Sequence, residues 1–159
     1  MKKMSLIFLL AISLNLSAQV SLPSISLKSL SGEMVNVQEK TNEGLYLVSF
    51  WASWCVSCIN ELDEISDVYD EWQEDLKVEL IAISIDDSRT KARVKPMVNG
   101  KGWEFEVLLD TNQELKRRMN VNSVPYIMII KDGKVVYSHS GYTPGQEDEI
   151  YELLKQYSK

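Results

Sequence analysis

Hydrophobic residues in this chain alternate between short continuous runs and runs with helical spacing. Residues 45–50 and 78–85 are nearly continuous apolar segments, which is typical of strands covered on both faces of a parallel sheet. Between them, apolar residues recur at the spacing of one helix face, and acidic residues fill most of the other positions. The apolar residues of this predicted helix are Ile59, Leu62, Ile65, Tyr69 and Trp72.

The remaining segments predict a regular succession of strands and helices. Alternation around Ser31-Gly32-Glu33 favours a short hairpin at residues 24–37, at the edge of the domain. The pair Asp132-Gly133 favours a two-residue turn in a second hairpin. The order of elements predicts a three-layer α/β domain. The other expected elements are a helix from 86–88 to 99–100, a strand at 105–109, a short helix at 113–119, strands at 126–130 and 135–138, and a last helix with Ile150, Leu153, Leu154 and Tyr157 on one stripe.

The only two cysteines lie where a strand should lead into a helix. Cys55 and Cys58 are separated by two residues and follow the predicted strand at 45–50. A first cysteine at a helix N-terminus lies beside partial positive charge, which stabilises its thiolate. A disulfide ring that encloses so few residues removes little chain entropy, so a purely structural disulfide is disfavoured. The spacing therefore predicts a redox-active disulfide.

Further residues on either side of the cysteines extend this pattern. The segment 50–58 is Phe-Trp-Ala-Ser-Trp-Cys-Val-Ser-Cys, Glu61 follows it, and Val124 and Pro125 precede the strand at 126–130. With these residues the chain resembles the thioredoxin superfamily, and more closely the TlpA/ResA-like extracytoplasmic thiol-disulfide oxidoreductases. The resemblance implies a three-layer thioredoxin-like fold with a central mixed sheet, an N-terminal β-hairpin and an inserted helix-strand unit at about 86–111.

The two cysteines are expected to have different roles. Cys55 is the expected nucleophile because it is nearer the helix start, and Cys58, one helical turn deeper, is the expected resolving thiol. Attack by Cys55 on a substrate disulfide gives a mixed disulfide, which Cys58 resolves. The intervening Val56 and Ser57 include neither the proline nor the charged or imidazole residue common between such cysteines, so they do not indicate the redox potential.

Glu61 is a candidate proton acceptor. In ResA-like proteins a glutamate six residues after the first cysteine lies beneath the pair, and Glu61 matches that position. A carboxylate there could accept the proton of Cys58. Ser49 occupies the position at which cytosolic thioredoxins carry a buried acid, and Asp63 the position at which a proline commonly kinks this helix. The alternative is a solvated glutamate on an acidic helix face.

Three further residues are expected to contact the substrate. The resemblance places a cis-proline loop against the cysteines at Pro125, where Val124 would offer backbone groups to a bound substrate strand. A proline at the start of a strand is also tolerated for backbone reasons alone. Trp54 is expected to shield the surface beside the cysteines, whereas core packing is an equal alternative for Trp51.

The N-terminus has the form of a secretory signal peptide. Residues 1–18 contain two lysines, then an apolar run, then small residues that end at Ala18. We expect cleavage there, which leaves residues 19–159 as one thioredoxin-like domain in a periplasmic or other extracytoplasmic compartment. An oxidising compartment of this kind permits disulfides. The alternative is an uncleaved segment that anchors the protein in the membrane, although the apolar run is short for a span.

Charge and composition exclude several kinds of partner. The full chain has 17 basic and 23 acidic residues, and the leader holds two of the lysines, so the exported chain would have a formal net charge of −8. An acidic chain without a basic cluster does not favour nucleic acid binding. His139 is the only histidine and lies far from the cysteines in sequence, which makes a zinc site a poor fit. We expect neither a metal nor another cofactor.

The sequence therefore predicts an exported, monomeric thiol-disulfide oxidoreductase. We expect it to reduce protein disulfides through Cys55 and Cys58, with apocytochrome c in cytochrome c maturation as the expected substrate. A membrane electron donor of the DsbD or CcdA type would supply the electrons. Two alternatives remain open at this point: a disulfide-forming oxidant or isomerase, and a non-catalytic metallochaperone that binds copper(I) through the two thiolates.

Overall fold

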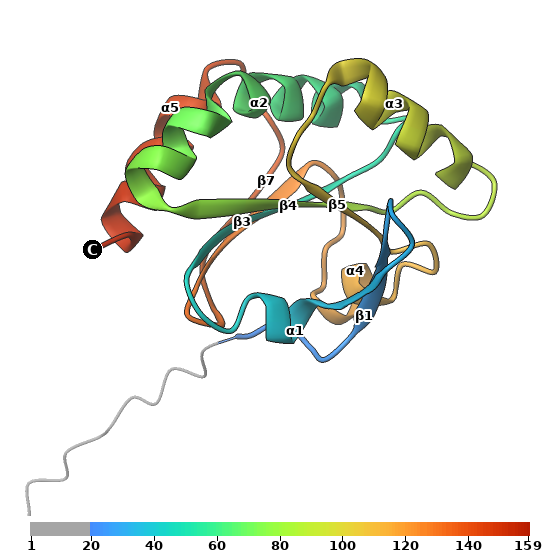
Figure 1. Cartoon of the computed structure of the whole chain (residues 1–159), viewed down its shortest axis with the longest axis horizontal. Coiled ribbons are helices and arrows are strands. Elements are labelled where there is room, and N and C mark those ends of the chain that lie inside the picture. Colours follow the sequence, from blue (N-terminus) through green and yellow to red (C-terminus); the bar gives the residue numbers. More distant parts are fainter. Residues whose placement is uncertain (1–19) are drawn as a thin grey trace, which may run out of the picture.

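The computed structural model describes residues 20–159, so the predicted leader lies outside the described residues. A seven-stranded mixed sheet lies between two layers of helices (Figure 1). This arrangement confirms the three-layer α/β fold expected from the order of elements. No helix within residues 20–159 is both long and apolar enough to cross a membrane. The helices are α1 (Val37–Lys40), α2 (Val56–Leu76), α3 (Val94–Lys101), α4 (Glu114–Arg118) and α5 (Gln146–Tyr157).

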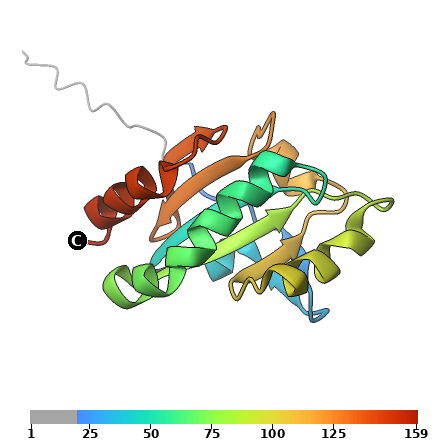
Figure 2. The ribbon, with the colours of Figure 1, turned by 90° about the horizontal axis from the view of Figure 1, so that it is seen from above.

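The strands are arranged in the order β2-β1-β5-β4-β3-β6-β7. The neighbours β3, β4 and β5 are parallel, whereas β6 is antiparallel to β3, and β1 and β2 form the predicted hairpin at one edge. Helices α2, α3 and α5 cover one face of the sheet, and α1 and α4 lie on the other (Figures 1 and 2). The strands are β1 (Ser26–Ser29), β2 (Met34–Asn36), β3 (Leu45–Trp51), β4 (Val78–Ser84), β5 (Glu106–Leu109), β6 (Tyr126–Lys131) and β7 (Lys134–Ser140).

Strands β3 and β4 form the centre of the sheet. Every residue of β3 is buried, as its continuous apolar sequence requires when helices cover both faces. The two strands are parallel and in register up to the pair Trp51 and Ser84. Just beyond that pair, the backbone N–H of Ile85 donates to the carbonyl oxygen of Trp51 at 2.8 Å. The segments that follow β3 and β4 therefore lie side by side at one edge of the sheet.

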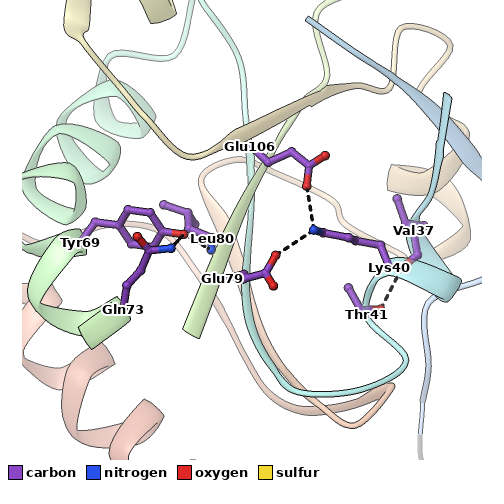
Figure 3. A network of polar contacts seen from close by, with 8 residues as sticks. All are labelled: Val37, Lys40, Thr41, Tyr69, Gln73, Glu79, Leu80 and Glu106. Carbon is purple, nitrogen blue, oxygen red and sulfur yellow. Dashed lines mark hydrogen bonds and ion pairs between the residues drawn. The ribbon is translucent and has the colours of Figure 1, made fainter. Parts of the chain in front are cut away.

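Helix α2 lies over the sheet and carries the predicted apolar stripe. Leu62, Ile65, Tyr69 and Trp72 are buried, which confirms the face expected from their spacing. Near the beginning of β4, the Leu80 N–H donates to the Tyr69 hydroxyl at 2.9 Å (Figure 3). This bond attaches α2 to the start of β4, at the end of the strand away from the cysteines.

A lysine attaches the opposite helical layer to the same part of the sheet. Lys40 in α1 places its Nζ 2.8 Å from Glu79 Oε2 in β4 and 3.5 Å from Glu106 Oε2 in β5 (Figure 3). The Glu79 hydrogen bond raises the pKa of Lys40. Helix α1 was not expected from the sequence, although Asn36 is a typical N-cap residue and its Oδ1 accepts the N–H groups of Gln38 and Glu39.

The inserted unit differs from its prediction at its start. Residues 86–88 do not begin a helix; a 3₁₀ turn at Lys91–Arg93 precedes α3 instead. The reason is that the Asp86 side chain accepts hydrogen bonds from Ser53 and Ser84 and is therefore not available as a cap. The remainder of the unit, α3 followed by β5, agrees with the prediction.

Candidate functional site

The two cysteines form a disulfide at the beginning of α2. Cys55 is the N-cap residue of α2, and Cys58 lies in its first turn. Cys55 is 9% exposed and Cys58 is completely buried. The Cys58 N–H donates to Cys55 Sγ at 3.3 Å, and Ser57 Oγ lies 3.6 Å from the same sulfur. Once the disulfide is reduced, these donors and the helix N-terminus would stabilise negative charge on Cys55.

Exposed apolar side chains flank the more accessible sulfur. Trp54 is 53% exposed and Val56 is 70% exposed, on either side of Cys55. Trp54 thus lies where the sequence placed it, beside the cysteines at the surface. Trp51 is fully buried and packs edge-on against Trp103 at 5.2 Å between ring centroids, which supports its core-packing alternative.

A buried aspartate holds the turn that precedes Cys55. Asp86 is 1% exposed and accepts hydrogen bonds from Ser53 N at 2.8 Å, Ser53 Oγ at 2.6 Å and Ser84 Oγ at 2.8 Å. These bonds connect the end of β4 to the turn after β3. Sequence reasoning missed this role and placed Asp86 in the segment 86–88 at the start of a helix. The available signal was its place directly after a buried strand, at the edge that also carries the cysteines.

The proline loop lies at the same edge of the sheet. The bond between Val124 and Pro125 is cis, as predicted. The loop leads into β6, whose first residue, Tyr126, pairs with Phe50 near the end of β3. The Pro125 carbonyl accepts a hydrogen bond from Gly141 N at 2.9 Å, whereas the backbone of Val124 has no hydrogen-bond partner among residues 20–159.

Glu61 is buried beneath the first turns of α2. Its exposed fraction is 2%, which excludes the alternative of a solvated glutamate. Ser49 in β3 donates to Glu61 Oε2 at 3.1 Å, and Glu61 Oε1 has no partner among the described residues. Burial raises the pKa of Glu61 to about 7; the Ser49 hydrogen bond opposes this shift and the Glu64 carboxylate adds to it. A carboxyl group with such a pKa can exchange a proton near neutral pH.

Asp63 connects α2 to the inserted unit. Helix α2 is continuous through this position, where a kinking proline was noted as absent. The Asp63 carboxylate lies 2.5 Å from Lys101 Nζ and accepts a 3.0 Å hydrogen bond from Trp103 Nε1. Since Trp103 also packs on Trp51, the inserted unit contacts both the helix and the strand that carry the cysteine turn. The sequence offered no signal for this contact.

The part of the chain that the structure describes contains no group of three or more His, Cys, Asp or Glu side chains that could hold a metal ion. His139 is exposed on β7, an edge strand of the sheet. The arrangement at the end of β3 thus consists of the two sulfur atoms, the buried carboxyl groups of Glu61 and Asp86, and an exposed apolar rim.

Comparisons with known proteins agree with this geometry. The model of the Redoxin family matches residues 17–154. The thiol-disulfide oxidoreductase ResA of Bacillus thuringiensis is 29% identical over 130 residues, which cover 81% of this chain and 73% of that protein.

Solved structures are similar over nearly the whole chain. An uncharacterized thioredoxin-like protein from Porphyromonas gingivalis is 41% identical with a TM-score of 0.75, covering 86% of this chain and 91% of its own. A secreted disulfide oxidoreductase of Mycobacterium tuberculosis, homologous to DsbE of E. coli, is 19% identical with a TM-score of 0.71, covering 84% and 96%. At 19% identity, the similarity to the Mycobacterium tuberculosis protein shows only a shared fold.

The buried carboxyl group predicts a pH-dependent stability. Its pKa in the folded protein, about 7, lies above the ordinary value of 4.5, so its contribution to stability is present below pH 4.5 and is lost as the pH rises through 7. Glu61→Gln removes this loss. The free energy of unfolding of the variant, relative to the unmodified protein, should therefore increase by about 2 to 3 kcal/mol between pH 5 and pH 8.

Urea denaturation of the two oxidised proteins at both pH values measures this difference. Glu71→Gln, which changes an exposed acid on the same helix, serves as the control and should show no such increase. If the free energies of unfolding of Glu61→Gln and of the unmodified protein differ by the same amount at pH 5 as at pH 8, the prediction is wrong.

Proposed function

The chain belongs to the Redoxin family, as a thioredoxin-like thiol-disulfide oxidoreductase of the TlpA/ResA kind, and we propose that it is an exported reductant of protein disulfides. The observation that carries the proposal is the placement of the disulfide at the start of α2. Cys55 is 9% exposed and lies between exposed apolar side chains, and Cys58 beside it is completely buried. This arrangement suits attack on a disulfide in another polypeptide, followed by internal resolution.

The reaction exchanges two electrons between disulfides. The Cys55 thiolate attacks one sulfur of a substrate disulfide, forms a mixed disulfide and expels the other substrate sulfur as a thiolate. Cys58 then loses its proton and attacks Cys55 Sγ, which releases the second substrate sulfur. The substrate gains two electrons and the protein returns to the Cys55–Cys58 disulfide. Because Cys58 is buried, its proton needs an acceptor inside the protein.

Glu61 is the proposed acceptor of that proton. It lies one helical turn after Cys58 on α2 and is buried. The ionised carboxylate takes the proton of Cys58 as this thiol becomes a nucleophile, and the protonated carboxyl group can then supply a proton to the departing substrate thiolate. The pKa of about 7 suits both directions of transfer near neutral pH.

The substrate is proposed to bind across the exposed rim of the site. Trp54 supplies an apolar surface, and the unpaired backbone of Val124 supplies hydrogen-bonding groups for an extended substrate segment. Pro125 fixes the start of β6 behind this segment. A surface of this kind binds through main chain and apolar contacts, so it accepts polypeptides of varied sequence once a disulfide is presented.

Export and the direction of electron flow complete the proposal. The signal-like sequence of residues 1–18 supports export, and the similar protein from Mycobacterium tuberculosis is described as secreted. A reductant in an oxidising compartment needs a continuous supply of electrons. We propose a membrane donor of the DsbD or CcdA type as that supply and apocytochrome c as a substrate.

The different roles of the two cysteines are tested by a matched pair of variants. Cys58→Ser should accumulate mixed disulfides with protein substrates, whereas Cys55→Ser should form none, because only Cys55 reaches the surface. In the reduced protein, a short pulse of iodoacetamide should label Cys55 before Cys58, as peptide mapping can measure. Faster labelling of Cys58, or mixed disulfides in Cys55→Ser alone, would reverse the assignment.

The direction of electron flow is tested by the resting redox state. Acid trapping of living cells followed by alkylation should find Cys55 and Cys58 mostly as thiols, because a reductant is kept reduced by its donor. Deletion of the membrane donor should shift the pair to the disulfide. A pair that rests oxidised in cells with an intact donor would instead indicate a disulfide-forming oxidant.

The proton acceptor is tested by the pH dependence of mixed-disulfide resolution. The rate should rise with pH through about 7, as Glu61 ionises and becomes able to accept the Cys58 proton. Glu61→Gln should lose this rise and slow the step by about 100-fold at neutral pH. Stopped-flow measurement of thiol release from a preformed mixed disulfide gives the rate. A profile that coincides with that of the unmodified protein would remove Glu61 from the reaction.

A further inference from the structure

A cluster of three side chains adjoins Glu61 where α2 packs against α5. The carboxyl cluster consists of Glu64 in α2, Tyr142 in the loop after β7, and Glu147 in the first turn of α5. Figure 2 shows the two helices side by side on one face of the sheet. The Tyr142 hydroxyl donates to Glu64 Oε1 at 2.5 Å. Glu64 Oε2 and Glu147 Oε2 are inaccessible to solvent and have no hydrogen-bond partner among residues 20–159.

Two neighbouring carboxylates repel each other, which makes one of them harder to ionise than the other. The hydrogen bond from Tyr142 lowers the pKa of Glu64, and this effect outweighs that of burial, which raises it. The pKa of Glu147 is raised: its own backbone N–H lowers it, but burial and the adjacent Glu64 carboxylate outweigh that effect. Of the two carboxyl groups, Glu64 therefore ionises more readily than Glu147.

Tyr142 remains a hydrogen-bond donor throughout the neutral range. Burial, and next the hydrogen bond to Glu64, raise the pKa of Tyr142 to about 12. The carboxyl cluster consequently favours negative charge on Glu64 over negative charge on Glu147. A negative charge held there can act on a neighbouring carboxyl group.

Glu61 is the neighbour on which this charge acts. Glu61 and Glu64 are three residues apart on α2, so their side chains lie on adjacent turns of the same helix face. The groups that act on Glu61 are the Ser49 hydroxyl from β3 and the Glu64 carboxylate from α2, and the latter raises the pKa of Glu61. The thiol of Cys58 lies two turns from Glu64 but only one turn from Glu61, so the charge acts more strongly on Glu61 than on the sulfur.

We propose that Glu64 is a positioning residue for the proton transfer: held by the Tyr142 hydroxyl, its carboxylate favours the state in which the Cys58 proton resides on Glu61. In this step the S–H bond of Cys58 breaks, an O–H bond forms on Glu61, and the sulfur keeps the electron pair with which it attacks Cys55 Sγ. The inference rests on the proposed function of Glu61 as the acceptor. It adds a residue that acts through Glu61 and contacts neither sulfur nor substrate.

Glu64→Gln tests the inference, because the amide keeps the shape and an acceptor for Tyr142 but removes the charge. The rise of the resolution rate with pH should move to lower pH by about half a unit, since Glu61 then ionises more readily. The rate at high pH should fall, because Glu61 becomes a weaker base. Carbon-13 NMR titration of the Glu61 carboxyl group should show the same displacement without any need for activity.

Asp67→Asn is the matched control. Asp67 is exposed on the next turn of α2, so its substitution removes the same formal charge from the surface of the helix. The pH profile should remain in place in this variant. A displacement as large as that of Glu64→Gln would mean that net charge alone is responsible and would overturn the inference.

The outcomes also separate this inference from the proposed function. In one outcome, Glu61→Gln loses the rise of the resolution rate with pH, while Glu64→Gln shows this rise and the NMR titration of Glu61 at unchanged pH. This outcome would overturn the role of Glu64 and leave that of Glu61 intact. A Glu61→Gln variant with an unchanged profile would overturn the role of Glu61, and with it the role of Glu64.

Discussion

The parallel pairing of β3 with β4, together with the antiparallel pairing of β3 with β6, determines where the site can form. Parallel strands end at the same edge of a sheet, and an antiparallel neighbour begins there. One edge therefore collects the cysteine turn after β3, Asp86 after β4 and the Val124–Pro125 loop before β6. The three segments come from widely separated parts of the sequence. A shift of one residue in the β3 pairing would turn Ser49 away from Glu61 and separate the hydrogen bonds that hold the cysteine turn.

Helix α2 combines structural and chemical requirements on one face. Its apolar residues fix the helix against the sheet, and the same face buries Glu61, a residue that a core would normally exclude. Burial of a carboxyl group is unfavourable for its ionised form, and this cost is what brings its pKa to about 7. Ser49 satisfies one oxygen and leaves the other without a partner among residues 20–159. The folded protein thus keeps one incompletely satisfied acid near its reactive sulfur atoms.

The features that the sequence predicted are those with local signals. Periodicity located the strands and α2, the Cys-x-x-Cys spacing located the disulfide, and Pro125 was recognised by its place before a strand together with the family resemblance. The roles of Asp86 and Asp63 were missed because both depend on contacts between segments far apart in the chain. The acidic composition of α2 suggested a solvated face, and that composition conceals Glu64, whose partners Tyr142 and Glu147 lie almost eighty residues or more away. No periodicity of α2 could identify them.

The two edges of the sheet affect how the protein can associate with other polypeptides. The outer strand β2 is only three residues long, and β7 has an irregular register with β6 and ends in the exposed residues Ser138, His139 and Ser140. Short, irregular or polar edges are poor templates for the addition of another strand. Strand pairing with an extended segment of another polypeptide is therefore disfavoured at both sides of the sheet. Edges of this kind also limit co-aggregation with incompletely folded chains.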